Sequence, residues 1–189
     1  MNTPAHAIIN LALLGRRAPL RSQFSVIGGA VLPDLPACLF YVVEKLVLGT
    51  PERRIFSEAY FDPRWQAFFD TFHSLPLIAV GLLGGVIARA RLAVLFFASM
   101  GLHALFDLPL HHDDAHRHFF PFSDWRFYSP LSYWDPAHHG QLGALVEILA
   151  VLIAAAALCV RAPSRVTPAF VGVLGGCYLA YFAYAFTAW

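Results

Sequence analysis

The sequence has little charge and few cysteines for its length. Lysine, arginine, aspartate and glutamate supply 13% of its 189 residues, about half the share found in soluble domains. The formal net charge is only +1, which leaves no basic face to bind a nucleic acid. The cysteines stand in apolar runs without a C-x-x-C pair, so neither a disulfide framework nor a thiolate zinc site is expected. We expect small core residues at Cys38, Cys159 and Cys177.

The sequence is instead rich in long apolar runs. Hydrophobic residues make up 58% of the chain, and the mean hydropathy is +0.59. A disordered chain cannot carry so much apolar surface, whereas helices that cross a membrane require it. We therefore predict an all-α polytopic membrane bundle that forms one domain over residues 1–189, with five transmembrane helices at about 24–48, 73–88, 92–110, 141–160 and 166–189.

Two local patterns refine this bundle. Thr3 and Pro4 are typical of an N-cap and a first helical residue, which predicts a short N-terminal helix that does not span the membrane by itself. Small residues at every fourth position allow two helices to approach closely. The sequence has two such motifs, Gly81-x-x-x-Gly85 and Gly172-x-x-x-Gly176.

The arginines predict the orientation of the bundle. Three connections on one side hold seven basic residues and no acidic ones: Arg16, Arg17, Arg21, Arg89, Arg91, Arg161 and Arg165. The positive-inside rule makes that side cytoplasmic. The long loop at 111–140, rich in histidine, aspartate and aromatic residues, then faces the periplasm, and the chain is predicted to lie in a bacterial inner membrane.

Several ionisable residues are predicted to share one depth in the membrane. Counted from the nearest cytoplasmic arginine at about 1.5 Å per residue, they lie about 18–24 Å above the cytoplasmic edge. They are Asp34, His73, His103, Asp107 and Glu147. An unpaired ionisable group at such a depth costs at least about 2.5–3.5 kcal/mol. We therefore expect these side chains to face partners or a polar cavity rather than lipid.

The pattern His103-Ala-Leu-Phe-Asp107 is the sharpest signal for a metal site. Residues four apart lie on one face of a helix, so His103 and Asp107 can ligate one cation or two neighbouring ones. Pro109 ends or kinks this helix and lets His111 and His112 turn back toward the same face. The alternative is a capped helix end with solvated loop histidines.

Asp34 lies in Leu32-Pro33-Asp34-Leu35-Pro36, a helix-breaking context within an apolar run. Irregular backbone at membrane depth is tolerated where it lines a cavity or is buried in protein. Asp34 is accordingly predicted to be a carboxylate of the site, with a helix cap as the alternative.

The other polar residues give weaker signals. His6 is a further candidate ligand because it opens the first helix near the same layer. His116 and His118 bind a second ion or belong to a solvated surface, and the roles of His138 and His139 stay open. Arg117 and Arg126 suit a phosphate of the substrate, or pair with loop aspartates. These aspartates are Asp113, Asp114 and Asp124.

The order of the motifs resembles a known family. Pro4-x-His6, Leu-Pro-Asp at 32–34, Thr-x-His-Ser at 71–74 and His103-x-x-x-Asp107 are similar to motifs of the YdjM-like inner-membrane metal-dependent hydrolases, over roughly residues 4–140. The succession is more distantly similar to zinc-dependent phospholipase C and P1-type nucleases. The resemblance implies zinc ligands at His73, His103, Asp107 and His111 or His112, with Asp34 as a ligand or general base.

Two departures from these patterns limit the expected number of metal ions. Residues 67–70 read Ala-Phe-Phe-Asp, without the arginine and histidine usual in the family. The phospholipase-type His-x-x-x-Glu is missing, since Gly143 stands four residues after His139 and Glu147 eight. A site with one or two metals is therefore expected.

Together these patterns predict a zinc-type hydrolase of phosphoesters embedded among membrane lipids. The metal would lower the pKa of a bound water, and Asp34 or Glu147 would orient that water. Because the site is expected at head-group level, lipid head groups or lipid-linked phosphates are the expected substrates. The alternatives are a metal- or haem-binding membrane protein without catalysis and a histidine-box di-iron lipid oxidase.

Overall fold

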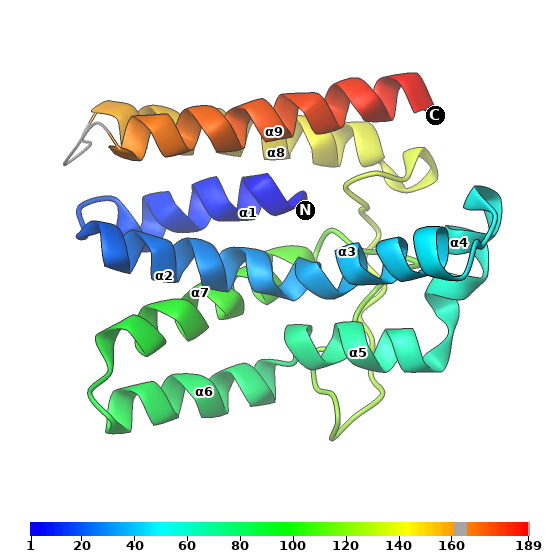
Figure 1. Cartoon of the computed structure of the whole chain (residues 1–189), viewed down its shortest axis with the longest axis horizontal. Coiled ribbons are helices and arrows are strands. Elements are labelled where there is room, and N and C mark those ends of the chain that lie inside the picture. The colour runs from blue at the N-terminus through cyan, green and yellow to red at the C-terminus, as the bar shows by residue number, and fades with distance from the viewer. Residues whose placement is uncertain (161–165, 189) are drawn as a thin grey trace.

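The computed structural model describes residues 1–160 and 166–188 (Figure 1). Within these ranges every regular element is helical and no strand occurs. The α-helices are α1 (Thr3–Asn10), α2 (Leu20–Val31), α3 (Leu35–Val42), α4 (Glu52–Ser57), α5 (Pro63–His73), α6 (Leu75–Ile87), α7 (Arg91–Asp107), α8 (Gly140–Val160) and α9 (Val166–Ala188). Single turns of other helix types occur at Leu11–Gly15, Leu32–Asp34, Val43–Val47, Ala59–Phe61 and Pro136–His138.

Three of these helical stretches are long and apolar enough to cross a membrane. They are Leu20–Val47, Pro63–Ile87 and Gly140–Val160, with 28, 25 and 21 residues. The prediction of a membrane helix bundle is thus supported by length and composition, but five spanning helices are not confirmed. The second stretch begins ten residues before the predicted start at 73, because α5 precedes α6 with only Ser74 between them.

Helix α7 is shorter than its predicted segment 92–110. It has 17 residues and ends at Asp107. Pro109 explains this end: the Leu108 amide still donates to the Ala104 carbonyl, but Pro109 has no N–H with which to continue the helix. The start of α1 also differs slightly from the expectation: Asn2 is the N-cap, and Thr3 is already helical with Pro4 in the first turn.

Close backbone contacts bring α2, α6 and α7 together (Figure 1). A Cβ added at Gly29 of α2 would lie 2.1 Å from the carbonyl oxygen of Phe96 on α7. The Gly81 motif behaves as predicted, because a Cβ at Gly81 would lie 2.3 Å from the Phe97 ring. At Gly172 and Gly176, by contrast, an added Cβ meets no described atom within 4 Å, so this second motif makes no close contact there.

Polar contacts fix α1 against α2 and α7. Asn10 of α1 donates from Nδ2 to the carbonyl and hydroxyl oxygens of Ser99 on α7, at 2.9 and 3.0 Å. The Ser99 hydroxyl in turn donates to the Val26 carbonyl of α2. All three residues are buried, so these hydrogen bonds set the register of three helices inside an apolar core.

The cysteines do not lie in the core. Cys38, Cys159 and Cys177 are all exposed on the outside of their helices. The prediction of core residues is wrong because, in an apolar run that crosses a membrane, the outer face is as apolar as the inner one.

The two arginine-rich turns within the described part lie at the same end of the molecule. Figure 1 places both the turn between α1 and α2 and the turn between α6 and α7 at the left end of the view. Arg161 and Arg165, which completed the predicted cluster, lie outside the described residues. The loop between α7 and α8 leaves from the middle of the bundle and extends toward the other end.

Candidate metal centre

Four side chains from separate elements meet inside the bundle. Asp34 lies at the break between α2 and α3, His73 ends α5, and His103 and Asp107 lie one turn apart at the end of α7. One ligand atom from each of them lies within 4.8 Å of the others. His73, His103 and Asp107 are buried, and Asp34 is half-buried. The depth count from the arginines therefore predicted a real convergence of Asp34, His73, His103 and Asp107.

Backbone carbonyls orient both histidines of this group. The Nδ1 atom of His73 donates to the Phe69 carbonyl at 3.0 Å, and that of His103 to the Ala30 carbonyl at 2.6 Å. A carbonyl oxygen only accepts, so Nδ1 carries the proton and a neutral ring keeps its lone pair on Nε2. Both Nε2 atoms are buried without a well-aligned hydrogen bond among the described residues. Two imidazole lone pairs thus face the centre of the group.

The two carboxylate oxygens of Asp107 have different neighbours. Oδ2 lies 2.9 Å from Nε2 of His103 and 3.7 Å from Nε2 of His73. Oδ1 lies 2.9 Å from Nε2 of His6 and 3.5 Å from Nε2 of His111. The amino group of Met1 lies 2.5 Å from the same Oδ1. One buried carboxylate therefore faces two sets of nitrogen atoms, and both His6 and His111 lie next to the four-residue group.

Asp34 is held in the group by a hydroxyl and is not a helix cap. Its Oδ1 lies 3.4 Å from Nε2 of His103, and its Oδ2 accepts a hydrogen bond from the Thr3 hydroxyl at 2.5 Å. Its side chain makes no capping hydrogen bond to α3. The Asp34 side chain is 21% exposed, against 2% for Asp107. The group is thus most open to its surroundings at Asp34.

The donor set fits a divalent cation. Imidazole nitrogens and carboxylate oxygens are the ligands that zinc takes in catalytic sites. The Met1 ammonium compensates the charge of Asp107, whereas the half-buried Asp34 keeps a negative charge that a bound cation would compensate. The four residues can therefore hold a metal ion.

No family model, curated protein or solved structure matches this chain. The resemblance to YdjM-like hydrolases thus stays a prediction.

His112 does not join the group, contrary to the prediction. Its Nδ1 donates to the Ser129 carbonyl at 2.6 Å, and its ring stacks on His138 at 3.6 Å between centroids. Only His111 turns back toward Asp107, because the chain after Pro109 folds against Ser129. His138 also pairs with Asp135, and His139 adopts a left-handed conformation just before α8.

Glu147 is buried outside the four-residue group. It accepts hydrogen bonds from the backbone and side-chain amides of Asn2 at 3.1 and 2.6 Å, and from the Tyr178 hydroxyl at 2.9 Å. These contacts hold the start of α1 against α8 and α9. Glu147 therefore supports the position of α1, which carries Thr3 and His6.

The two arginines expected to bind phosphate are paired within the protein. Nε of Arg117 donates to Asp70 at 2.5 Å, and its Nη1 donates to Asp124 at 2.6 Å. A guanidinium nitrogen of Arg126 lies 3.6 Å from the same Asp70 carboxylate. Of the three loop aspartates offered as alternative partners, only Asp124 has this role. The main partner is Asp70 on α5, which is fully buried.

Sequence reasoning missed Asp70 and left His116 undecided. The His116 ring stacks on His73 at 3.8 Å, and its Nδ1 lies 3.6 Å from Asp70 Oδ1. Asp70 and His73 are three residues apart on one helix, a spacing that puts both on one face. The same-face spacing that identified His103 and Asp107 on α7 would also have identified Asp70 as a residue beside the site, had α5 been predicted as a helix.

Burial and nearby charges shift the pKa values of the loop residues beside the group. Burial, with the neighbouring His73, lowers the pKa of His116 to about 3, and burial lowers that of His118 to about 4. Burial and the Met1 ammonium also disfavour charge on His111, but Asp114 and Asp107 outweigh them and raise its pKa to about 9. Two loop histidines are thus neutral at pH 7 and a third is protonated when no metal is bound.

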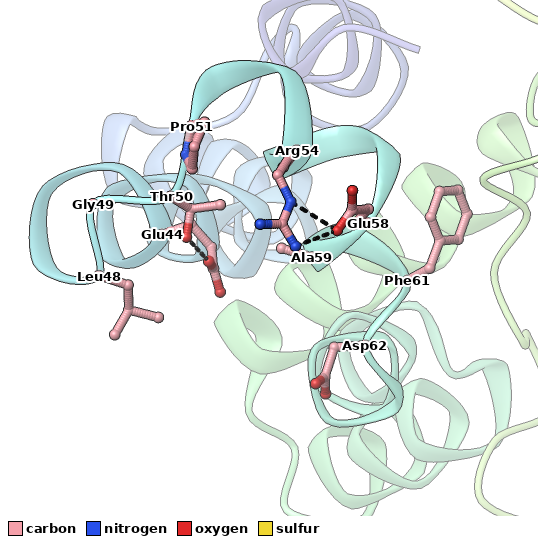
Figure 2. A pocket seen from close by; sticks show the side chains of 10 residues that line it. All are labelled: Glu44, Leu48, Gly49, Thr50, Pro51, Arg54, Glu58, Ala59, Phe61 and Asp62. Atoms are coloured by element: carbon pink, nitrogen blue, oxygen red, sulfur yellow. Dashed lines mark hydrogen bonds and ion pairs between the residues drawn. The ribbon is translucent and has the colours of Figure 1, made fainter.

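A separate cavity of about 580 Å³ lies near the far end of α3 and contains none of the four residues. Figure 2 shows two of its polar pairs: Arg54 binds Glu58, and the Thr50 hydroxyl donates to Glu44. Asp62, which also lines the cavity, pairs with Arg64 outside this view. Because these groups satisfy one another, the cavity offers no comparable set of ligands.

Proposed function

We propose that this protein is a membrane-embedded hydrolase that binds a divalent metal ion, zinc by its donor set, and cleaves phosphoesters. The observation that carries the proposal is the group of Asp34, His73, His103 and Asp107, with two Nε2 lone pairs and two carboxylates turned inward. The family resemblance suggests the same reaction class. A metal ion of this type supplies a bound water of lowered pKa and polarises a phosphoryl oxygen.

The residues of the group take different roles in this proposal. His73, His103 and Asp107 are the most buried, so they hold the ion. Asp34 is the most exposed member, and its carboxylate orients the attacking water and accepts its proton. His6 and His111, together with the Met1 amino group in its uncharged form, offer a second position at the other oxygen of Asp107, so that the site takes one or two ions.

The substrates we propose are lipid head groups or lipid-linked phosphates. The helices that carry the site are apolar on the outside, and the group lies near the end of α7 away from the arginine-rich turns. A phosphoester in the adjoining leaflet reaches this depth more directly than a soluble one. By the positive-inside rule, the proposed location is the periplasmic leaflet of an inner membrane.

The first test is the metal content of protein purified without chelators. We expect one or two divalent ions per chain in the wild type and a loss of most of this metal in Asp107→Asn and His103→Gln, because each removes a buried ligand. Asp113→Asn is the matched control, since this carboxylate is 70% exposed and lies outside the group. Wild-type protein without metal, or unchanged content in both ligand variants, would refute the site.

The second test is turnover of a phosphodiester lipid in nanodiscs. A chelator should abolish hydrolysis and zinc should restore it. Asp34→Asn should retain metal on the three other ligands yet lose roughly 10²-fold or more in turnover, as expected for the loss of a general base. Equal rates at equal metal occupancy would remove Asp34 from the reaction. A visible absorption band would instead favour haem or di-iron.

A further inference from the structure

The middle of the loop between α7 and α8 carries three exposed aromatic side chains, Phe119, Phe122 and Trp125, which we call the aromatic tip. Their exposed fractions are 43%, 78% and 48%. The rings of Phe119 and Trp125 are 5.7 Å apart, and the Phe122 amide donates to the Phe119 carbonyl at 2.9 Å, so one turn of the loop carries all three side chains. Figure 1 shows this part of the loop projecting past α5, away from α8 and α9. Exposed apolar patches often mark interaction sites, membrane surfaces among them.

The aromatic tip is fixed to the junction between α5 and α6. The Ser74 hydroxyl donates to the Phe120 carbonyl at 2.5 Å, and the Leu75 amide donates to the His118 carbonyl at 2.9 Å. The Arg117 amide also donates to the buried Asp70 carboxylate at 2.9 Å. The tip therefore keeps a defined height relative to α6.

That height lies within a leaflet if α6 crosses the membrane. Ser74 is 15 residues from Arg89, or about 22 Å along a helix, while the hydrocarbon core is about 30 Å thick. The outer surface of α6 is apolar, with Leu77, Val80 and Leu83 at 38%, 70% and 59% exposed. Because the tip is hydrogen-bonded at Ser74 and Leu75, a leaflet that covers the first turns of α6 lies at the height of the tip.

The charges around the tip fit the boundary between acyl chains and head groups. Asp124 is 89% exposed, yet it is paired with Arg117. Trp is enriched at this boundary, and Phe side chains of interfacial segments are buried in it, where a paired charge can remain hydrated. From the attachment of the tip to the start of the apolar helix α6 and from this paired charge, we infer that the aromatic tip inserts into the lipid leaflet beside α6 and anchors the loop there. The occupant is bilayer lipid, and the inference does not depend on catalysis.

Collision accessibility of a spin label tests this inference in phosphatidylcholine–phosphatidylglycerol nanodiscs. A nitroxide is placed at Phe122→Cys in a background where the native cysteines are alanine. Val80→Cys on the exposed face of α6 is the lipid reference, and Ser57→Cys on α4 is the aqueous reference. We expect the label at 122 to match that at 80, with oxygen collisions several-fold more frequent than those with a water-soluble nickel chelate.

Two results would overturn the inference. Accessibility like that at 57 would show a hydrated loop, and low accessibility to both reagents would show contact with a second copy or another protein. If the Phe122 variant does not fold, Trp125 replaces the label: brominated acyl chains should quench wild-type fluorescence more than that of Trp125→Phe. Equal quenching of the two proteins would also reject insertion.

Discussion

The hydroxyl of Thr3 holds the carboxylate of Asp34, the most exposed residue of the candidate centre. It donates to Oδ2 of Asp34 at 2.5 Å, while Oδ1 of the same carboxylate lies beside His103. A donor in this position selects one orientation of the carboxylate and leaves the other oxygen for a metal or water. Groups that orient a ligand in this way commonly contribute tenfold to hundredfold to metal affinity.

We predict that Thr3→Val weakens zinc binding by about 10-fold or more, whereas Thr3→Ser keeps near wild-type affinity. Valine has the shape of threonine but cannot donate to Asp34. Competition with a chromogenic zinc chelator measures the affinity. The control is Thr71→Val, because the exposed Thr71 hydroxyl bonds only to the Ala67 carbonyl of its own helix. Equal affinity in the valine and serine variants at position 3 would show that Thr3 does not position Asp34.

The sequence predicted the ligands better than their supporting contacts. Spacing on α7 paired His103 with Asp107, and counts from the arginines brought Asp34 and His73 to the same layer. Thr3 was interpreted only as a helix start, because nothing in a sequence shows that α1 packs against the break at Asp34. The two adjacent loop histidines could not be distinguished, since the fold of an irregular loop decides which ring faces Asp107.

At the scale of elements, Asp70 joins α5 to the long loop. This fully buried carboxylate accepts hydrogen bonds from the backbone and side chain of Arg117 and lies near Arg126. Removing one partner of a buried ion pair leaves an uncompensated charge, which costs more than the loss of an exposed pair. Asp70 also lies beside His116, which stacks on His73, so the same contact braces one wall of the candidate centre.

We predict that Asp70→Asn destabilises the attachment of the loop by up to about 3–5 kcal/mol, whereas Asp124→Asn costs about 0–1 kcal/mol. Asp124 is the matched control because it pairs with the same arginine but is 89% exposed. Limited trypsin digestion measures the effect, since the loop contains Arg117 and Arg126. Cleavage there should accelerate in the Asp70 variant alone. Similar rates in both variants would show that Asp70 does not anchor the loop.

Element boundaries were predictable where a local rule sets them. Proline ended α7 close to its predicted end, and the Leu-Pro-Asp break interrupted the second segment at Leu32–Asp34. Helix α5 was not predicted, because in the sequence its polar residues are typical of a loop between two membrane helices. They become helical in the fold because its buried face, with Phe69 and Asp70, packs against α3 and the long loop.

At the scale of the whole molecule, the two ends of the helix bundle differ in charge and in packing. The turns that carry the arginines lie together at one end of the bundle, while the long loop emerges from the middle toward the other. The sequence predicted this asymmetry from charge alone. It could not settle how many helices cross, because apolar runs at 92–110 and 166–189 meet the composition of a span without fixing the length of the helix.

The orientation proposed above, in a bacterial inner membrane, predicts which positions react with a membrane-impermeant maleimide. Single cysteines at Ala18 and Ala90 should react only after the inner membrane is permeabilised, since positive turns stay in the cytoplasm. A cysteine at Asp113 should react in intact cells with an opened outer membrane, because its carboxylate is 70% exposed on the opposite side of the candidate centre. Reaction of all three after permeabilisation is the control. Protection at 113 with reaction at 18 and 90 in intact cells would show the opposite orientation. The candidate centre and its substrate would then lie in the cytoplasmic leaflet.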